Sequence, residues 1–320
     1  MSFLKPILIS FTFFAVLNSC RKSGCQAYTS NDPVTSPYTG PVWHPGGNIL
    51  GFNHQVVRGV NYDKCANKSY ASFYPDSSGF WLINKDGTNM RRVTSFLLQT
   101  PPWSPDGRWI AFANGGVIYK MSFDGVNFDT TNIIALTDAN WNHFTPSWSP
   151  MGDTIYYETD ENTPLHTEFY FIWKMAADGS GKMDITDSTG ARTPFCTSDN
   201  QILHFRYPKG SQQMQVFIMD INGNNIRQVT NNTMDFTYTY YFNYFKSKVF
   251  YEGFDIWSCN TDGSDMQKVV SNSSEGFSIS KDGVIAYINF DGNIIDKTHG
   301  TLWVTDTNGK SPKSLTYNFY

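Results

Sequence analysis

The stretch of sequence that decides the fold is Pro102-Trp103-Ser104-Pro105-Asp106-Gly107-Arg108-Trp109-Ile110-Ala111-Phe112. Proline fixes one backbone dihedral, aspartate can bond its own backbone and glycine accepts a positive φ, so the chain reverses here between two strands. The stretch recurs as Pro146-Ser147-Trp148-Ser149-Pro150-Met151-Gly152 and as Pro41-Val42-Trp43-His44-Pro45-Gly46-Gly47. Looser copies begin at Phe195 and Ile279, and a degenerate one covers residues 242–251.

Two further signals accompany each copy. An apolar run closes on Asp-Gly or Asn-Gly, and in most copies a short strand follows that ends in an aliphatic residue and threonine. The glycines of the second signal are Gly87, Gly125, Gly179, Gly223, Gly263 and Gly309. Their spacing matches one four-stranded unit, which cannot bury both faces alone and must stack on its neighbours. We therefore predict an all-β fold, a six-bladed β-propeller of four-stranded antiparallel blades over residues 38–320.

Composition agrees with this fold and excludes some partners. Hydrophobic residues make up 40% of the 320 residues, too many for a disordered chain. Charged residues make up 16% and the net charge is −4, so we expect no nucleic-acid partner. Aromatic residues make up another 16%, which suits the filling of wedge-shaped gaps between blades.

The N-terminus predicts export. Lys5 precedes an apolar run over residues 7–17, which is too short to span a bilayer as a helix. Residues 1–19 therefore read as a signal peptide, and Leu17-Asn18-Ser19-Cys20 resembles the lipobox of bacterial lipoproteins. The resemblance implies that Cys20 is lipidated and that residues 20–37 form a tether; an ordinary cleaved signal is the alternative. Arg21 and Lys22 stand where surface lipoproteins of the Bacteroidetes carry acidic residues, which favours the periplasmic side of the outer membrane.

The repeat also resembles a known type. The pattern P-x-W-S-P-D-G-x-x-I-A-F, then D-G, then L-T is similar to the TolB type of β-propeller repeat, and it extends over residues 41–316. TolB carries an N-terminal α/β domain ahead of its propeller, whereas residues 21–40 alone separate Cys20 from the first repeat here. We therefore expect the propeller without that domain, and we carry over the fold but not the partners of TolB.

No catalytic motif accompanies the repeat. The chain has no G-x-S-x-G and no H-E-x-x-H, and the Asp-Gly aspartates recur as turn residues. Propeller lyases acting on oligogalacturonate, which share this repeat type, use a histidine-rich metal site, so the six histidines are the sharpest enzymatic signal. They show no close spacing, and we expect no metal and no cofactor. The sequence does not decide whether Cys25 and Cys65 form a disulfide. We expect Cys196 and Cys259 to be buried apolar residues.

Strand order predicts where ligands bind. Both kinds of turn fall at one end of the propeller, and the irregular loops gather at the other, where function usually lies. Those loops hold His54, Arg58, Tyr62, Tyr70, Tyr74, Trp141, His143, His166, Arg192, Arg206 and Tyr238. We select Trp141, His143, Arg192, Arg206, His54 and Tyr238 as ligand contacts for a protein, peptide or glycan. A non-enzymatic binding or scaffold module of the envelope is the leading hypothesis, and an oligogalacturonate-lyase-like enzyme is the alternative.

Overall fold

Antiparallel β-strands dominate the part of the chain that the computed structural model describes, namely residues 27–30, 37–63, 68–161, 170–186, 190–231, 241–291 and 300–317. Within these ranges there is no helix with the length and apolar character that crossing a membrane requires. The chain divides into two units, Met1–Asp32 with Arg58–Ser72 and Pro33–Val57 with Phe73–Tyr320. The second unit contains the repeats.

Six sheets make up this second unit, and their strands are hydrogen-bonded in chain order. The first strands are β2 (Tyr38–Trp43), β11 (His143–Trp148), β15 (Arg192–Cys196), β19 (Phe242–Phe245) and β23 (Ser273–Ile279). The second strands are β3 (Ile49–His54), β8 (Trp109–Asn114), β12 (Thr154–Thr159), β16 (Gln201–Arg206), β20 (Lys248–Glu252) and β24 (Val284–Asn289). In blade 2 the first strand is reduced to two bridges, Gln99 to Ala113 and Trp103 to Ile110.

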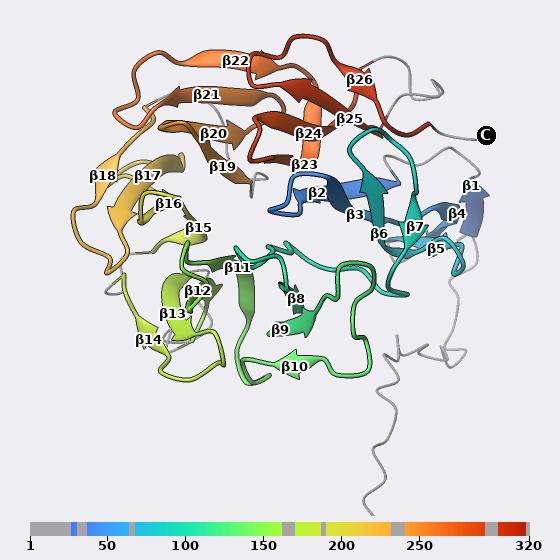
Figure 1. The fold of residues 1–320 in the computed structure, drawn as a ribbon, viewed down its shortest axis with the longest axis horizontal. Helices are drawn as coiled ribbons and strands as arrows, with labels where there is room; N and C mark the ends of the chain where they lie inside the picture. The colour runs from blue at the N-terminus through green and yellow to red at the C-terminus, as the bar shows by residue number, and fades with distance from the viewer. Residues whose placement is uncertain are drawn as a thin grey trace, which may run out of the picture. The chain divides into compact units, whose positions relative to one another are not determined.

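The outer half of each blade is equally regular. The third strands are β6 (Gly79–Asn84), β9 (Val117–Ser122), β13 (Phe171–Ala176), β17 (Gln215–Asp220), β21 (Ile256–Asn260) and β25 (Thr301–Asp306). The fourth are β7 (Arg91–Arg92), β10 (Ile134–Ala135), β14 (Met183–Asp184), β18 (Arg227–Gln228), β22 (Gln267–Val270) and β26 (Lys313–Ser314). Figure 1 shows the six sheets arranged in a ring with their first strands innermost, which confirms the predicted six-bladed propeller.

The ring closes where blade 6 meets blade 1. Each of these two blades keeps its own strands, in the orders β23-β24-β25-β26 and β2-β3-β6-β7. The junction is made by side-chain packing, and the backbone N–H of Trp43 donates a hydrogen bond to Ser278 Oγ at 3.1 Å. In the described part of the chain the ring is thus held by contacts between complete blades.

The hydrophobic core lies between the blades. Six clusters of buried side chains occupy the six blade interfaces, and each cluster draws on two consecutive blades. Between blades 4 and 5, for example, the rings of Phe205 and Phe242 stack with centroids 4.2 Å apart. Between blades 6 and 1, Ile288 packs in one cluster with Leu50. Burying one such side chain contributes roughly 1.5–3 kcal/mol, so these wedges supply the main stabilisation.

Two of the repeated sequence signals are hydrogen-bonding devices. In the first, Ser104 Oγ accepts a hydrogen bond from the N–H of Trp109 at 3.0 Å and so closes the turn before the second strand. Ser149, Thr197 and Ser280 act in the same way towards Thr154, Gln201 and Val284. In the other, the threonine that ends a repeat accepts the N–H of the second residue of its own third strand: Thr94 from Phe80, Thr137 from Ile118, Thr186 from Ile172, Thr230 from Val216 and Thr316 from Leu302.

The glycine of the remaining signal is required by the preceding blade. At Gly223, where φ is +85°, a Cβ would lie 1.7 Å from the carbonyl oxygen of Ile185, which precedes the repeat threonine of blade 3. The same close approach occurs from Gly179 to Leu136, Gly263 to Val229 and Gly309 to Val269, at 2.9, 2.1 and 1.9 Å. Gly87 faces the Leu315 carbonyl at 3.6 Å, an ordinary van der Waals distance. Gly125 of blade 2 is different, because its φ is +99° but no atom of the described part of the chain lies within 4 Å of its Cβ position.

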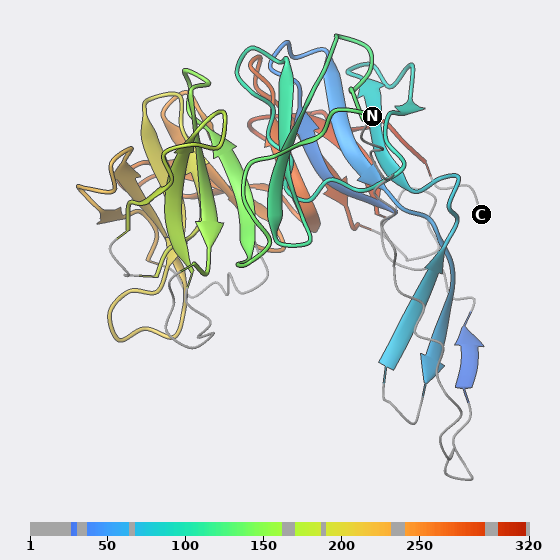
Figure 2. The ribbon, with the colours of Figure 1, turned by 90° about the horizontal axis from the view of Figure 1, so that it is seen from below.

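The strand register separates two ends of the propeller. Thr154, which follows the first turn of blade 3, pairs with Ala176, which precedes the second turn, so both turns lie at one end. His143 pairs with Thr159 at the opposite end, where the irregular connections leave the blades. We call these the turn end and the loop end, and the side view in Figure 2 shows the blade strands running between them.

Two stretches differ from the sequence-based expectation. Between β3 and β6, where the repeat predicts an irregular connection, β4 (Val57–Asp63) and β5 (Lys68–Phe73) join β1 (Ala27–Ser30) in a three-stranded sheet that belongs to the first unit. β1 pairs with β4 over a long sequence separation, whereas β4 and β5 are consecutive in the sequence. These short polar strands carry no apolar alternation that would predict them. At the turn end, the β9–β10 connection 123–133 is nearly twice as long as its counterparts 85–90, 177–182, 221–226, 261–266 and 307–312.

Substituting the two turn glycines Gly223 and Gly125 by alanine tests the docking between blades. Both positions have positive φ, so each variant should lose about 1–2 kcal/mol of unfolding free energy from backbone strain. Gly223→Ala should lose a further 1–3 kcal/mol because its methyl group clashes with the Ile185 carbonyl. Urea unfolding measures both values, and equal losses in the two variants would contradict the docking.

Candidate functional site

The structure places the sequence-selected residues at the loop end, but not all together. Trp141 precedes β11, His143 begins β11, Arg192 begins β15, Arg206 ends β16 and His54 ends β3. Tyr238 and Cys20, like Cys25, Cys65, His166 and His299, lie outside the described residues. The first four belong to blades 3 and 4, whereas His54 packs within blade 1 against Tyr38 and Trp81.

A buried carboxylate organises the boundary between blades 3 and 4. Glu158, next to the end of β12, is 2% exposed. It accepts hydrogen bonds from Arg192 Nε at 2.9 Å, from the backbone N–H of Thr193 at 2.8 Å and from Thr145 Oγ1 at 3.3 Å. A buried charge is tolerated only when paired and hydrogen-bonded in this way. Glu158 therefore fixes the start of β15 and the guanidinium of Arg192.

Arg192 is held on two sides and still reaches solvent. Its guanidinium carbon lies 4.4 Å from the centre of the Tyr170 ring, a cation–π arrangement, while Nε pairs with Glu158. The side chain keeps 29% exposure. Arg206, at the end of the neighbouring strand, is half-buried and lies 6.0 Å over the ring of Phe217. Two oriented guanidinium groups are thus presented at the loop end of blade 4, an arrangement suited to a carboxylate ligand.

The two threonines that contact Glu158 have strained backbones. Thr145 has φ +45° and Thr193 has φ +56°, values that are rare for a β-branched residue. Each sits at a register shift in the first strand of its blade, and Thr100 of blade 2 has φ +44° at the corresponding place. The sequence signal is the dipeptide Thr-Pro shortly before the repeat Trp or Cys. Sequence reasoning missed it, although it marks where the inner strands are bent next to the site.

The two selected histidines are packing residues in this structure. His143 is 1% exposed, and among the described residues neither ring nitrogen has a hydrogen-bond partner. Its ring meets Tyr157 edge-on at 5.6 Å. Burial lowers the pKa of His143 below its ordinary value and lowers the pKa of His54 to about 4. Trp141, Arg192 and Arg206 are therefore the members of the selected set that a ligand can reach.

Glu252 occupies the equivalent position between blades 5 and 6. It is 2% exposed, accepts hydrogen bonds from Ser273 Oγ at 2.9 Å and from the N–H of Gly276 at 3.0 Å, and thereby fixes the start of blade 6. Desolvation raises the pKa of its carboxyl to about 7. The same place in blade 1 is taken by Asn53, whose amide bonds both backbone groups of Leu98 in blade 2.

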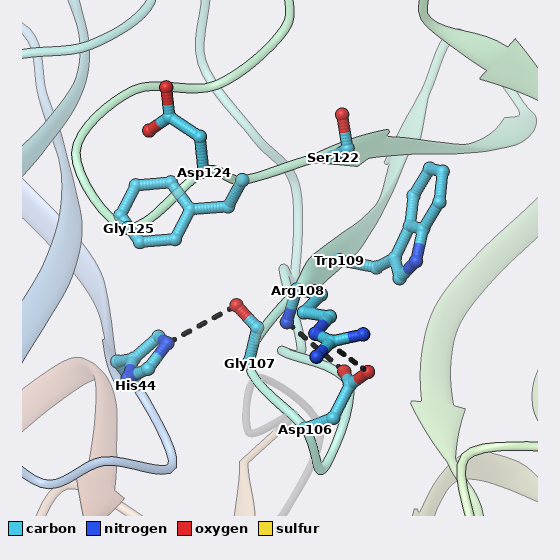
Figure 3. A pocket seen from close by; sticks show the side chains of 9 residues that line it. His44, Asp106, Gly107, Arg108, Trp109, Ser122, Asp124 and Gly125 are labelled. Atoms are coloured by element: carbon cyan, nitrogen blue, oxygen red, sulfur yellow. Dashed lines mark hydrogen bonds and ion pairs between the residues drawn. The ribbon is translucent and has the colours of Figure 1, made fainter.

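A pocket opens at the turn end, where the sequence predicted only tight turns. It has a volume of about 640 Å³ and lies on blade 2 where blade 1 approaches. His44 reaches it from blade 1 and lies 3.2 Å from the carbonyl oxygen of Gly107 (Figure 3). The remaining walls are Asp106, Arg108, Trp109, Ser122, Phe123, Asp124 and Gly125. The sequence does not reveal this pocket, because Asp124-Gly125 has the same pattern as the repeated turns of the other blades.

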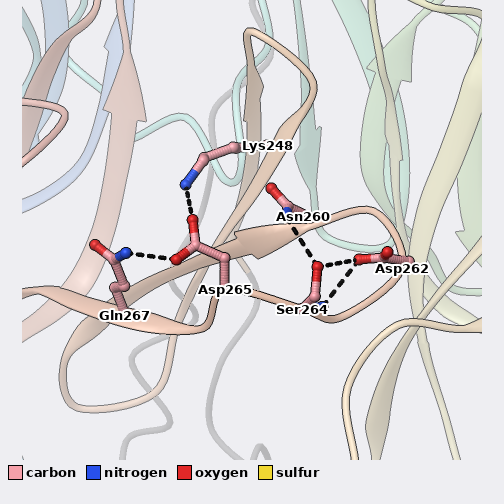
Figure 4. Close-up of polar contacts among 6 residues, drawn as sticks. All are labelled: Lys248, Asn260, Asp262, Ser264, Asp265 and Gln267. Atoms are coloured by element: carbon pink, nitrogen blue, oxygen red, sulfur yellow. Dashed lines mark hydrogen bonds and ion pairs between the residues drawn. The ribbon is translucent and has the colours of Figure 1, made fainter.

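The other turn aspartates are engaged in closing their own turns. In blade 5, Asp262 Oδ1 accepts the N–H of Ser264 at 3.0 Å and its hydroxyl at 2.6 Å, and Asn260 donates to the same hydroxyl (Figure 4). Beside it Asp265 pairs with Lys248 at 2.6 Å. These hydrogen bonds lower the pKa of both carboxyl groups. Asp262 is an acceptor for its turn, as the periodicity of the Asp-Gly aspartates indicates, whereas Asp265 accepts from Lys248 and from Gln267.

In the described ranges no three His, Cys, Asp or Glu side chains converge into a group that could hold a metal ion. Cys196 and Cys259 are free thiols, and burial raises the pKa of Cys196 to about 12 and that of Cys259 to about 11. The thiolate form is therefore disfavoured at both.

No protein-family model matches the chain. An uncharacterized protein of Agrobacterium fabrum is 26% identical over 163 residues, which cover 47% of this chain and 52% of that protein. The chain thus spans about half the length of the curated relative that it matches.

Solved structures with the same architecture are TolB-like β-propellers. TolB from Acinetobacter baumannii has a TM-score of 0.61 at 13% identity, covering 85% of this chain and 77% of that one. A protein assigned as TolB from Agrobacterium tumefaciens has a TM-score of 0.56 at 16% identity, covering 72% and 85%. Oligogalacturonate lyase from Vibrio parahaemolyticus has a TM-score of 0.50 at 13% identity, covering 92% and 85%. At these identities the likeness shows the fold alone.

Buried titratable groups predict how stability depends on pH. Desolvation holds the pKa of His54 at about 4 and that of His204 at about 3, against 6.5 for a free histidine. Below pH 6.5 these histidines are protonated in the unfolded chain but stay neutral in the folded protein, so the free energy of unfolding falls as the pH drops towards 4. Glu252, with its raised pKa of about 7, acts in the opposite direction between pH 7 and 4.5.

Urea unfolding from pH 7 to pH 4 checks this with two variants. The free energy of unfolding should fall between pH 7 and pH 4, and His204→Phe should make that fall smaller by roughly 3 kcal/mol, because one pKa unit corresponds to about 1.4 kcal/mol. Phenylalanine fits the place, since Phe52 and Phe112 occupy it in blades 1 and 2. Glu252→Gln should make the fall in unfolding free energy larger. If neither substitution changes this fall, the pKa shifts of His204 and Glu252 do not cause it.

Proposed function

We propose that this protein is an exported binding module of the bacterial envelope, anchored through Cys20 and facing the periplasm, which captures a carboxylate-bearing peptide or glycan at the loop end of its propeller. The observation that carries the proposal is Arg192, held between the buried Glu158 and the Tyr170 ring while part of its side chain stays in solvent. A guanidinium that is oriented before binding loses little conformational freedom when a ligand carboxylate reaches it.

The neighbours of Arg192 support a peptide or glycan ligand. Arg206 lies at the same end of blade 4 and offers a second planar set of donors. Trp141, half-buried before β11, offers an aromatic surface for a sugar ring or an apolar side chain. The propeller beneath is rigid because each blade boundary is packed, so these groups hold their spacing. The TolB-like fold of the structural neighbours is compatible with a scaffold role.

The test is capture of defined probes by the full chain carrying Cys20→Ala, which we expect in the soluble fraction. The probes are a labelled oligogalacturonide and a labelled peptide with a free C-terminal carboxylate, each compared with its esterified or amidated form. We expect the carboxylate forms to bind, and Arg206→Ala to weaken binding about tenfold, equivalent to about 1.4 kcal/mol, at unchanged unfolding midpoint.

Arg192 needs a milder substitution, because Arg192→Ala would leave the buried Glu158 without its ion-pair partner at a cost of about 3–5 kcal/mol. Arg192→Lys keeps the charge and loses the planar fork, so it should weaken capture without unfolding the protein. Lys281→Ala, an exposed cation of the turn end, is the matched control. Capture that is equal for free and esterified probes, or that survives both arginine variants, would overturn the proposal. Cleavage of the oligogalacturonide to unsaturated products would favour the lyase hypothesis instead.

A further inference from the structure

Three departures from the repeat meet at one place, the turn end between blades 1 and 2. No atom of the described residues lies within 4 Å of the Gly125 Cβ position, whereas the other five turn glycines approach a carbonyl of the preceding blade. The connection 123–133 is extended. His44 replaces the hydroxyl residue that closes the first turn in blades 2, 3, 4 and 6. Local violations of an otherwise regular pattern mark candidate functional positions.

His44 is locked rather than free to move. Its Nδ1 accepts the N–H of Gly46 at 3.0 Å, so Nε2 carries the proton and donates to the carbonyl of Gly107 at 3.2 Å. The ring stands edge-on to Trp103 at 4.8 Å. Gly107 must be glycine, because a Cβ there would lie 2.3 Å from His44 Nε2. The histidine therefore joins blade 1 to the floor of the pocket.

The extended connection is also firmly held. Asp124 Oδ1 accepts the N–H groups of Val126 at 2.8 Å and Asn127 at 2.7 Å. The Phe128 ring stacks on Trp103 at 5.2 Å, and Arg91 of blade 1 donates to the carbonyl of Val126 at 2.9 Å. A loop fixed at its start, middle and tip gives the pocket a defined shape.

The lining combines apolar rings with hydrogen-bonding groups of both kinds (Figure 3). Trp109 and Phe123 are the aromatic walls, and Ser122 is the cross-strand partner of Trp109. Asp106 and Asp124 are acceptors, since hydrogen bonds within their turns lower the pKa of both carboxyl groups. Arg108 is a donor whose side chain is 81% exposed. Aromatic surface between a few fixed polar groups is typical of small-ligand sites.

We propose that this pocket binds a neutral pyranose ring of a glycan, as a second site separate from the loop end. A sugar presents apolar C–H faces to Trp109 and Phe123, and its hydroxyl groups can donate to Asp106 and Asp124 while accepting from Arg108 and Ser122. An anionic sugar is disfavoured by the two carboxylates. A simple cation would leave the arginine and serine donors unused. The site does not depend on the function proposed for Arg192 and Arg206.

Titration calorimetry of the full chain with Cys20→Ala tests the site, with maltose, cellobiose and N,N′-diacetylchitobiose as neutral probes and digalacturonate as the anionic comparator. We expect at least one neutral disaccharide to bind with a dissociation constant of about 1 mM, as suits a single ring in an open pocket. Asp124→Asn keeps the turn acceptor and should weaken binding at least tenfold. Asparagine is tolerated here, since Asn222 and Asn308 stand at this place in blades 4 and 6.

Asp178→Asn is the matched control, because Asp178 closes the equivalent turn of blade 3, whose glycine docks on blade 2. It should leave binding unchanged, as should Arg206→Ala at the loop end. Ser122→Phe, which fills the pocket, should abolish binding at an unchanged melting temperature. The proposal is overturned if no neutral disaccharide binds at a concentration of about 10 mM, tenfold above that dissociation constant. It is also overturned if Asp124→Asn and Asp178→Asn bind alike, or if digalacturonate binds and the neutral disaccharides do not.

Discussion

Packing between consecutive blades is the constraint on which the rest of the structure depends. A four-stranded sheet with apolar side chains on both faces cannot be stable alone, and here each face is covered by the next blade. The six buried clusters are all of this kind, and the junction of blades 6 and 1 is packed like the others. This packing also explains why the irregular connections lie at the ends of the propeller, because a loop can vary in length only where it does not disturb the packed interface between two blades.

The repeat predicted the fold because its signals encode contacts that every blade needs. Gly223 was recognisable from its Asn-Gly turn, and the structure adds the reason, a close approach to the Ile185 carbonyl of the preceding blade. Thr230 was recognisable as the end of a repeat, and its hydroxyl proves to accept the N–H of Val216. Such contacts recur at a fixed period, so one sequence displays them several times. Composition could not have shown them.

The site was predictable only in part. The sequence placed Arg192 and Arg206 at the loop end, because strand order fixes which residues lie there. It could not show that Glu158, 34 positions before Arg192, is the partner that orients it, since this contact occurs once and has no period. The sheet of β1, β4 and β5 was not predicted for a related reason, since β1 pairs with β4 across a long sequence separation and the short strands carry no apolar pattern. The pocket beside His44 was not predicted, because the lengthened turn of blade 2 still contains the Asp-Gly pair of the repeat.

Native-state hydrogen exchange of the blade strands tests most directly that the ring is held by equivalent contacts between complete blades. The amides of β3 and β24, on either side of the closing junction, should exchange with the same free energy as those of β12 and β16, and that value should equal the free energy of global unfolding. Exchange of β3 and β24 at a distinctly lower free energy, with β12 and β16 still protected, would show that the ring opens at blades 6 and 1 and would contradict the account.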